Sequence, residues 1–211
     1  IKFGSPELFS EIIFIDNSIE ENKTNLFNPQ ESIDLLRENG YNAKLINGDD
    51  LTKSFQVIKN TPWRDQQLLK LLISKEVHSD NYLLLDAKNL FIRSLSVSDF
   101  IKKEKLVTFE FSCPPALRKW LEASCEYIGT EVPKNWVCMP TATPYMVKKS
   151  IANEILDSPD FVKKFYGNTN LTEFFIYYAF LKNKNKIDEI YTYEKQFYAT
   201  FFTTYPDTPD A

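Results

Sequence analysis

The sequence predicts an α/β fold in which a mostly parallel sheet is flanked by helices. Three observations support this prediction. Short apolar runs alternate with helix-like segments along most of the 211 residues, as expected for successive β-α-β units. The run NYLLL at residues 81–85 is apolar almost throughout, which is typical of a strand covered on both faces. Hydrophobic residues form 43% of the chain, enough to build a sizeable core.

In the first half of the chain, we predict strands at residues 11–16, 41–46 and 81–85 and helices at 29–39 and 63–77. The run EIIFID at 11–16 leads into Asp-Asn-Ser, which favours a turn after a buried strand. Gly40 stands where a helix over 29–39 would stop. The segment 63–77 is the clearest helix, because its leucines lie on one side and its charged and amide residues on the other.

In the second half, we predict strands at residues 105–111 and 136–143 and helices at 116–127, 147–156 and 171–181. Residues 191–211 are aromatic first and then rich in Pro and Asp, which predicts a terminal strand or two and a tail. We therefore expect one domain over residues 1–190, followed by this C-terminal segment. Its aromatic residues fit either a core or an interface: Tyr191, Tyr193, Phe197 and Tyr198.

Composition argues against several classes of protein. The formal net charge of -4 gives no reason to expect a nucleic-acid partner, which would require a concentrated basic face. The three cysteines form no CxxC pair and His78 is the only histidine, so we expect reduced thiols and no Cys/His zinc site. No apolar run approaches the roughly 20 residues of a membrane span, so no transmembrane segment is expected.

The carboxyl end of the predicted strand at 81–85 is the first candidate site. Asp86, Lys88 and Asn89 follow this strand directly, and ligands of open α/β sheets bind at the carboxyl ends of the strands. An acid, a cation and an amide together are suited to a diphosphate, directly or through a metal. The alternative is that Asp86 and Asn89 only form the turn, since short polar residues favour turns for local reasons.

The helix over 63–77 adds three candidates, each with a structural alternative. Trp63 is suited to stacking on a sugar or base, or to plain packing. Gln67 and Lys70 cannot both be core residues without partners, so they face either a ligand or solvent.

Two glutamates are candidates for an acid–base role. Glu110 interrupts the apolar run VTFEF, where a carboxylate needs a partner or a function. Glu173 opens an otherwise apolar helix. It fits a general base, or a residue that simply complements the helix dipole.

The block WRDQQLLKLLISKEVHSDNYLLLDAKNLFIRSL at residues 63–95 resembles the centre of a family of bacterial glycosyltransferases of the GT-A type, long described only as a domain of unknown function. Members show an aromatic residue, paired glutamines and a Leu-Lys helix, then an apolar strand ending in Asp and a Phe-Ile/Val-Arg segment. Residues 137–146 and 172–177 resemble later parts of the family more loosely.

The resemblance implies a GT-A-like, Rossmann-like fold and a cytoplasmic enzyme, near the inner membrane where lipid-linked acceptors lie. Such an enzyme moves a sugar from a nucleotide sugar to a hydroxyl of a bacterial surface glycan, of the capsule or lipopolysaccharide type. Glu173 and Glu110 are then the candidates for the catalytic base. The resemblance assigns six residues to the donor: Trp63, Gln67, Lys70, Asp86, Lys88 and Asn89.

Two departures from the family pattern favour an alternative. GT-A enzymes commonly present Asp-x-Asp after this strand to hold Mn²⁺ or Mg²⁺, whereas this chain has DAKN at 86–89. Asp86 and Asn89 remain candidate metal ligands, with Lys88 and Lys70 as alternative partners of the leaving diphosphate. The first strand and helix of a GT-A domain are also expected to be missing. The alternative is a non-catalytic module that binds a glycan or a protein.

Overall fold

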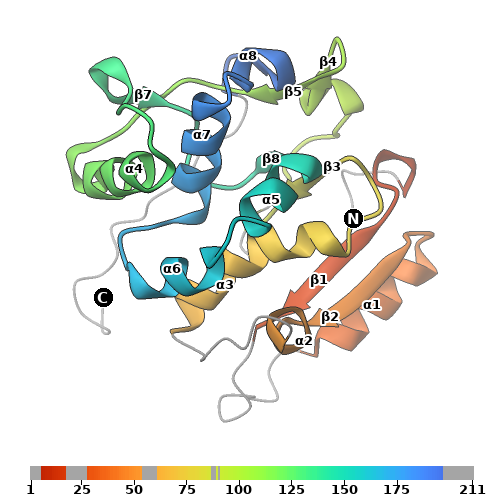
Figure 1. Cartoon of the computed structure of the whole chain (residues 1–211). Coiled ribbons are helices and arrows are strands. Elements are labelled where there is room, and N and C mark those ends of the chain that lie inside the picture. The colour runs from red at the N-terminus through yellow and green to blue at the C-terminus, as the bar shows by residue number, and fades with distance from the viewer. Residues whose placement is uncertain (1–5, 18–27, 54–60, 87–88, 90, 197–211) are drawn as a thin grey trace, which may run out of the picture.

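The computed structural model describes residues 6–17, 28–53, 61–86, 89 and 91–196 (Figure 1). Its strands are β1 (Ile12–Asp16), β2 (Ala43–Asn47), β3 (Asn81–Leu84), β4 (Ile101–Lys102), β5 (Lys105–Thr108), β6 (Phe111–Ser112), β7 (Val137–Cys138), β8 (Tyr145–Lys148) and β9 (Tyr191–Tyr193). Its helices are α1 (Pro29–Glu38), α2 (Gly48–Lys53), α3 (Pro62–Leu72), α4 (Pro115–Ile128), α5 (Lys149–Leu156), α6 (Phe161–Gly167), α7 (Glu173–Asn183) and α8 (Ile187–Ile190).

The chain begins with a β-α-β unit, as the apolar runs predicted. β1 and β2 pair in parallel, from Ile12 opposite Ala43 to Asp16 opposite Asn47. Helix α1 connects them; the side chain of Asn28 caps its start by accepting the N–H of Gln30. Both strands therefore end at the same edge, where short polar residues follow each of them.

The predicted mostly parallel, GT-A-like sheet is wrong. The described strands form four small sheets, in which β3 pairs with β8, β4 with β5, and β6 with β7 in antiparallel fashion, while β9 joins β5 in parallel. Apolar periodicity identifies a strand but carries no information on its direction, which the connections determine. Between β4 and β5, Lys103 and Glu104 both have positive φ. A two-residue turn of that kind sends the second strand back antiparallel.

Two of the predicted elements were also placed wrongly. The strand predicted at 136–143 is limited to Val137–Cys138. The helix predicted from residue 147 begins at Lys149, because the two residues before it belong to β8. In both segments a short apolar stretch lies next to a turn, and periodicity alone cannot assign so short a stretch.

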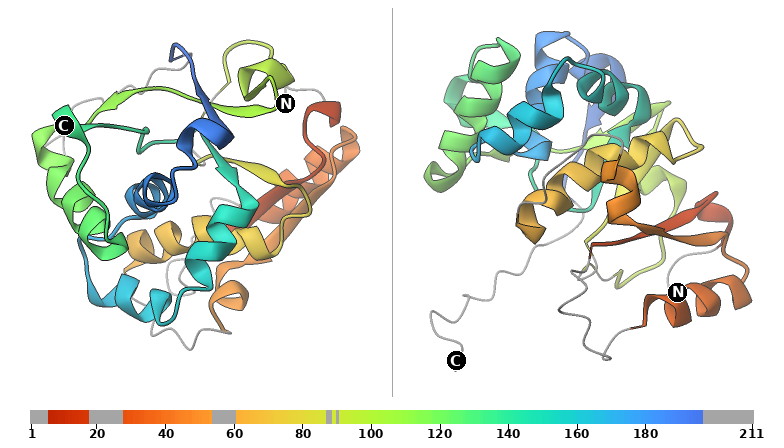
Figure 2. Two further views of the ribbon diagram at one scale, coloured as in Figure 1. Left: turned by 45° about the horizontal axis from the view of Figure 1, so that its top comes forward. Right: turned by 60° about the horizontal axis from the view of Figure 1, so that its bottom comes forward.

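Helix α7 lies at the centre of the core, against α3, α4 and α5. Its residues from Glu173 to Ala179 and Leu181 are buried, as expected for a helix that is apolar nearly all round. Figure 2 shows β1, β2 and α1 on one side of α3, with α5, α6 and α7 on the other. The three cysteines are buried and free, in keeping with the predicted reduced thiols.

The first residues of the C-terminal segment are part of the core. Tyr191 is buried, and its hydroxyl bonds to the hydroxyl of Tyr177 (2.8 Å) and donates to the carbonyl of Met146 (2.9 Å). Tyr193, in the same strand, is 41% exposed. Phe197 and Tyr198 lie outside the described residues. Within the part of the chain that the structure describes, no helix combines the length and the apolar character needed to cross a bilayer.

Candidate functional site

A charged cluster forms where α3, β3 and α7 meet. The Nζ atom of Lys70 lies 3.2 Å from Oδ1 of Asp86 and 3.2 Å from Oε1 of Glu173. The same ammonium lies 4.9 Å from the centre of the Phe174 ring. The structure thus brings together three predicted site residues that are widely separated in the sequence.

Local structure fixes each member of this cluster. Helix α3 starts with Pro62 after the capping residue Thr61. The hydroxyl of Tyr82, on β3, donates to the carbonyl of Lys70 at 3.0 Å and ties the strand to the helix. Beyond β3, the backbone N–H of Asp86 donates to Oδ1 of Asn89 at 2.6 Å. The predicted turn role of Asp86 and Asn89 is therefore confirmed, and it holds the Asp86 carboxylate next to Lys70.

Glu173 is the most deeply buried member of the cluster. Only 5% of the residue is exposed. Burial raises the pKa of its carboxyl above the ordinary value of 4.5, while Lys70 opposes this and the charge of Asp86 adds to it. Glu173 is also the first residue of α7, where the helix dipole favours its charged form. It is therefore a carboxylate of increased basicity with one cationic neighbour at hydrogen-bond distance.

Gln67 lies one helical turn before Lys70 and is 3% exposed. Its Oε1 atom is buried and accepts no hydrogen bond from any described residue. Leaving a buried amide oxygen unpaired costs about 1–3 kcal/mol. A ligand that donates a hydroxyl or N–H to this oxygen would remove that cost, so the position suits the predicted donor-binding role.

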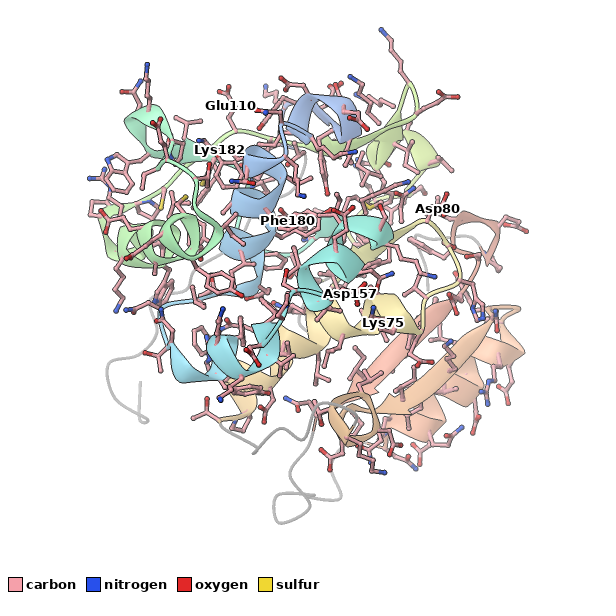
Figure 3. All side chains as sticks on the ribbon, viewed as in Figure 1. Lys75, Asp80, Glu110, Asp157, Phe180 and Lys182 are labelled. Carbon is pink, nitrogen blue, oxygen red and sulfur yellow. The ribbon has the colours of Figure 1, made fainter. Side chains whose placement is uncertain are left out.

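Two of the other predicted site residues, Glu110 and Trp63, do not join the cluster. Glu110 follows β5 and is exposed (Figure 3). Trp63 is 48% exposed and its ring centre lies 6.0 Å from that of Trp120, so at least part of its role is packing against α4. Lys88 lies outside the described residues. The stick view also shows the exposed Lys75–Asp157 ion pair (2.9 Å), which joins the 3₁₀ turn after α3 (Ile73–Lys75) to the residue after α5.

The two predicted metal ligands, Asp86 and Asn89, both have protein partners in this arrangement. The oxygen of Asn89 already accepts the N–H of Asp86, and the ammonium of Lys70 already occupies one side of the Asp86 carboxylate. Across the described ranges, no group of three or more His, Cys, Asp or Glu side chains is placed to hold a metal. Metal dependence stays a prediction.

A second feature lies at the carboxyl ends of β1 and β2. A small hollow there is lined by the residue that follows β1 and by residues of α2, α3 and α6: Asn17, Gly48, Asp49, Thr52, Asp65, Leu69 and Tyr166. A Cβ atom on Gly48 would lie 3.0 Å from the carbonyl oxygen of Asp16, so a larger residue here would require a shift of a few tenths of an ångström. Leu69 lines the hollow and is the neighbour in sequence of Lys70.

Sequence reasoning missed this hollow, because it interprets Asp16-Asn17 only as a turn. The sequence nevertheless contains a signal for this hollow. Two neighbouring parallel strands that each end in short polar residues place those residues at one edge.

The sequence pattern of a family of unknown function (DUF6492) matches residues 3–202. The chain belongs to this family. The DUF6492 match includes the Lys70 cluster and the whole hollow, so both features lie inside the family's domain. No curated protein matches the chain, and the description of DUF6492 assigns no activity.

Proposed function

We propose that this protein is a glycosyltransferase that moves a sugar from a nucleotide-sugar donor to a hydroxyl of a bacterial surface glycan, of the capsule or lipopolysaccharide type. The observation that carries the proposal is the buried carboxylate of Glu173, whose pKa burial raises, held by Lys70 beside the carboxyl end of β3. The resemblance of residues 63–95 to bacterial glycosyltransferases also supports it. We place the reaction in the cytoplasm.

In this proposal Glu173 is the general base of an inverting transfer. The acceptor hydroxyl oxygen forms a bond to the anomeric carbon of the donor, and its proton passes to the Glu173 carboxylate. The bond between the anomeric carbon and the diphosphate oxygen breaks, and the nucleoside diphosphate leaves. A base is most effective when its pKa lies near the working pH, and burial moves the pKa of Glu173 in that direction.

Lys70 suits a role in holding the two carboxylates better than a role as the diphosphate partner. One ammonium and two carboxylates sum to a formal charge of -1 when Asp86 and Glu173 are both ionised. A site of this charge does not attract a diphosphate by itself. We assign Lys70 to holding the two carboxylates and Gln67 to accepting a hydrogen bond from the donor sugar.

One observation favours the alternative of a non-catalytic binding module. Lys70 is neutralised on two sides, as in an ion cluster that only stabilises a fold. Such a module would bind a glycan or a protein and no nucleotide.

The deciding experiment uses the purified chain, a panel of nucleotide sugars, and conditions with and without Mn²⁺ or Mg²⁺. Donor binding raises the melting temperature, since a ligand at 100 times its Kd adds about 2.7 kcal/mol to stability. Release of nucleoside diphosphate reports transfer. We expect Glu173→Gln to keep donor binding and to lose roughly 10²–10⁴-fold in transfer rate. Glu110→Gln, at the exposed glutamate, is the control and keeps full activity. A folded chain that binds no nucleotide contradicts the proposal and favours the binding module.

A further inference from the structure

Arg64, in the first turn of α3, is a buried cation with an unusual set of partners. Only 3% of the residue is exposed. Its guanidinium donates hydrogen bonds to the backbone carbonyls of Phe165, Leu171 and Asn168, the one to Asn168 at 3.2 Å. It also lies 4.1 Å from the centre of the Phe165 ring.

These three carbonyls span the connection between α6 and α7. The Phe165 carbonyl belongs to the last turn of α6, where carbonyls have no partner within the helix. A cation at a helix C-terminus also interacts favourably with the helix dipole. The Leu171 carbonyl lies two residues before Glu173. Arg64 therefore fixes the chain from the end of α6 almost to the first residue of α7.

A second contact joins the same two regions. The hydroxyl of Tyr166 donates to Oδ1 of Asp65 at 2.6 Å, so consecutive residues of α3 hold consecutive residues of α6. Glu173 and Arg64 also interact electrostatically. Burial lowers the pKa of the Arg64 guanidinium, and the charge of Glu173 is the largest of the effects that raise it. The groups that face the Glu173 carboxylate electrostatically are thus Lys70, Asp86 and Arg64.

We propose that Arg64 is a positioning residue, which locks the α6–α7 connection onto α3 and so places the Glu173 carboxylate beside Lys70. The inference rests on the proposed role of Glu173 as the base. A lysine would keep the charge at this position, but its single ammonium cannot span three carbonyls as the planar guanidinium does. In Arg64→Lys the first turn of α7 loosens, water reaches Glu173, and its carboxylate leaves the position at which it meets Lys70.

The test is a ¹³C NMR titration of the glutamate carboxyls, with the Glu173 signal assigned by its loss in Glu173→Gln. We expect Arg64→Lys to lower the pKa of Glu173 from its raised value towards the ordinary 4.5, because burial is the main cause of the raised value. The matched control is Arg118→Lys on α4. The guanidinium of Arg118 stacks on Trp136 at 4.5 Å, and no hydrogen bond or ion pair joins it to the described residues of the cluster. The Arg118→Lys variant should leave the pKa of Glu173 unchanged.

An Arg64→Lys variant that is less stable but titrates Glu173 at the wild-type pKa overturns the proposal, because a purely structural role predicts that result. If Arg64→Lys does not fold, Tyr166→Phe cuts the second contact of the same junction. A fall in the Glu173 pKa then supports the proposal, and an unchanged pKa overturns it. The titration needs no substrate, so it decides the role of Arg64 even if the chain transfers no sugar. Where transfer is observed, kcat should fall more than the donor KM rises.

Discussion

At the residue scale, the balance at Glu173 decides what the site can do. Burying a lone carboxylate is unfavourable enough that such a group usually takes up a proton. Lys70, at 3.2 Å, offsets part of that penalty, while Asp86 on the other side of the ammonium competes for the same charge. Glu173 therefore holds its proton more tightly than an exposed carboxyl does. When it ionises, the ammonium of Lys70 lies next to the negative charge.

This balance predicts a pH dependence of stability. From pH 4.5 up to its raised pKa, folded Glu173 keeps a proton that the unfolded chain has released. The free energy of unfolding should therefore fall as pH rises through this window. Glu173→Gln, which cannot titrate, should lack this part of the decrease. Urea unfolding of both proteins at several pH values measures the difference, and identical pH profiles would contradict it.

At the element scale, a chain of buried hydroxyls joins α7 to β8 and β9. The N–H of Lys148 donates to the hydroxyl of Tyr177 at 2.8 Å, which donates to that of Tyr191, which donates to the carbonyl of Met146. Helix α7 is thus attached to two strands by directional bonds as well as by its apolar surface. The aromatic pattern predicted a buried helix here, but these hydroxyl partners come from segments distant in sequence.

We predict that Tyr177→Phe lowers the free energy of unfolding by about 1–3 kcal/mol, because it leaves the buried Lys148 N–H without an acceptor. Tyr178→Phe is the matched control on the same helix, since the Tyr178 hydroxyl forms no hydrogen bond with another described residue; its effect should be smaller. Urea unfolding of the two variants gives the comparison. Equal losses would mean that the hydroxyl chain contributes nothing specific.

At the scale of the whole molecule, one core joins the β1–α1–β2 unit to the remainder. Leu51 of α2 belongs to the main cluster, and Ile13, Ile15 and Ile46 pack against it. A Cβ on Gly48 would lie 3.0 Å from a methyl carbon of Leu69, so α2 and α3 are in close contact. The small sheets do not correspond to separate cores.

We therefore predict that the protein unfolds in one cooperative transition. Trp63, Trp120 and Trp136 all lie after the β1–α1–β2 unit, so fluorescence reports the remainder while far-UV circular dichroism reports every helix. The two urea transitions should coincide. Gly48→Ala, which disturbs the contact between α2 and α3, should shift both midpoints together. An early loss of circular dichroism alone would show that the first unit unfolds separately.

The sequence by itself determined where most helices lie, that a strand begins at Asn81, and that Asp86 follows it; the strand ends at Leu84 and only alternate residues of it are buried. These properties depend on local periodicity, capping and turn residues, all within a few positions of one another. It also identified Lys70, Asp86 and Glu173 as candidates, because a charged residue next to an apolar run needs a partner or a function.

Only the tertiary structure decided the direction of the strands and the meeting of those three residues. Strand direction depends on connections such as the Lys103-Glu104 turn, and the mostly parallel sheet predicted from alternation alone was therefore wrong. The pairing of Lys70 with Glu173 spans more than 100 residues. It depends on Arg64 fixing the α6–α7 connection, and a side chain can reach three distant carbonyls only once the chain has folded.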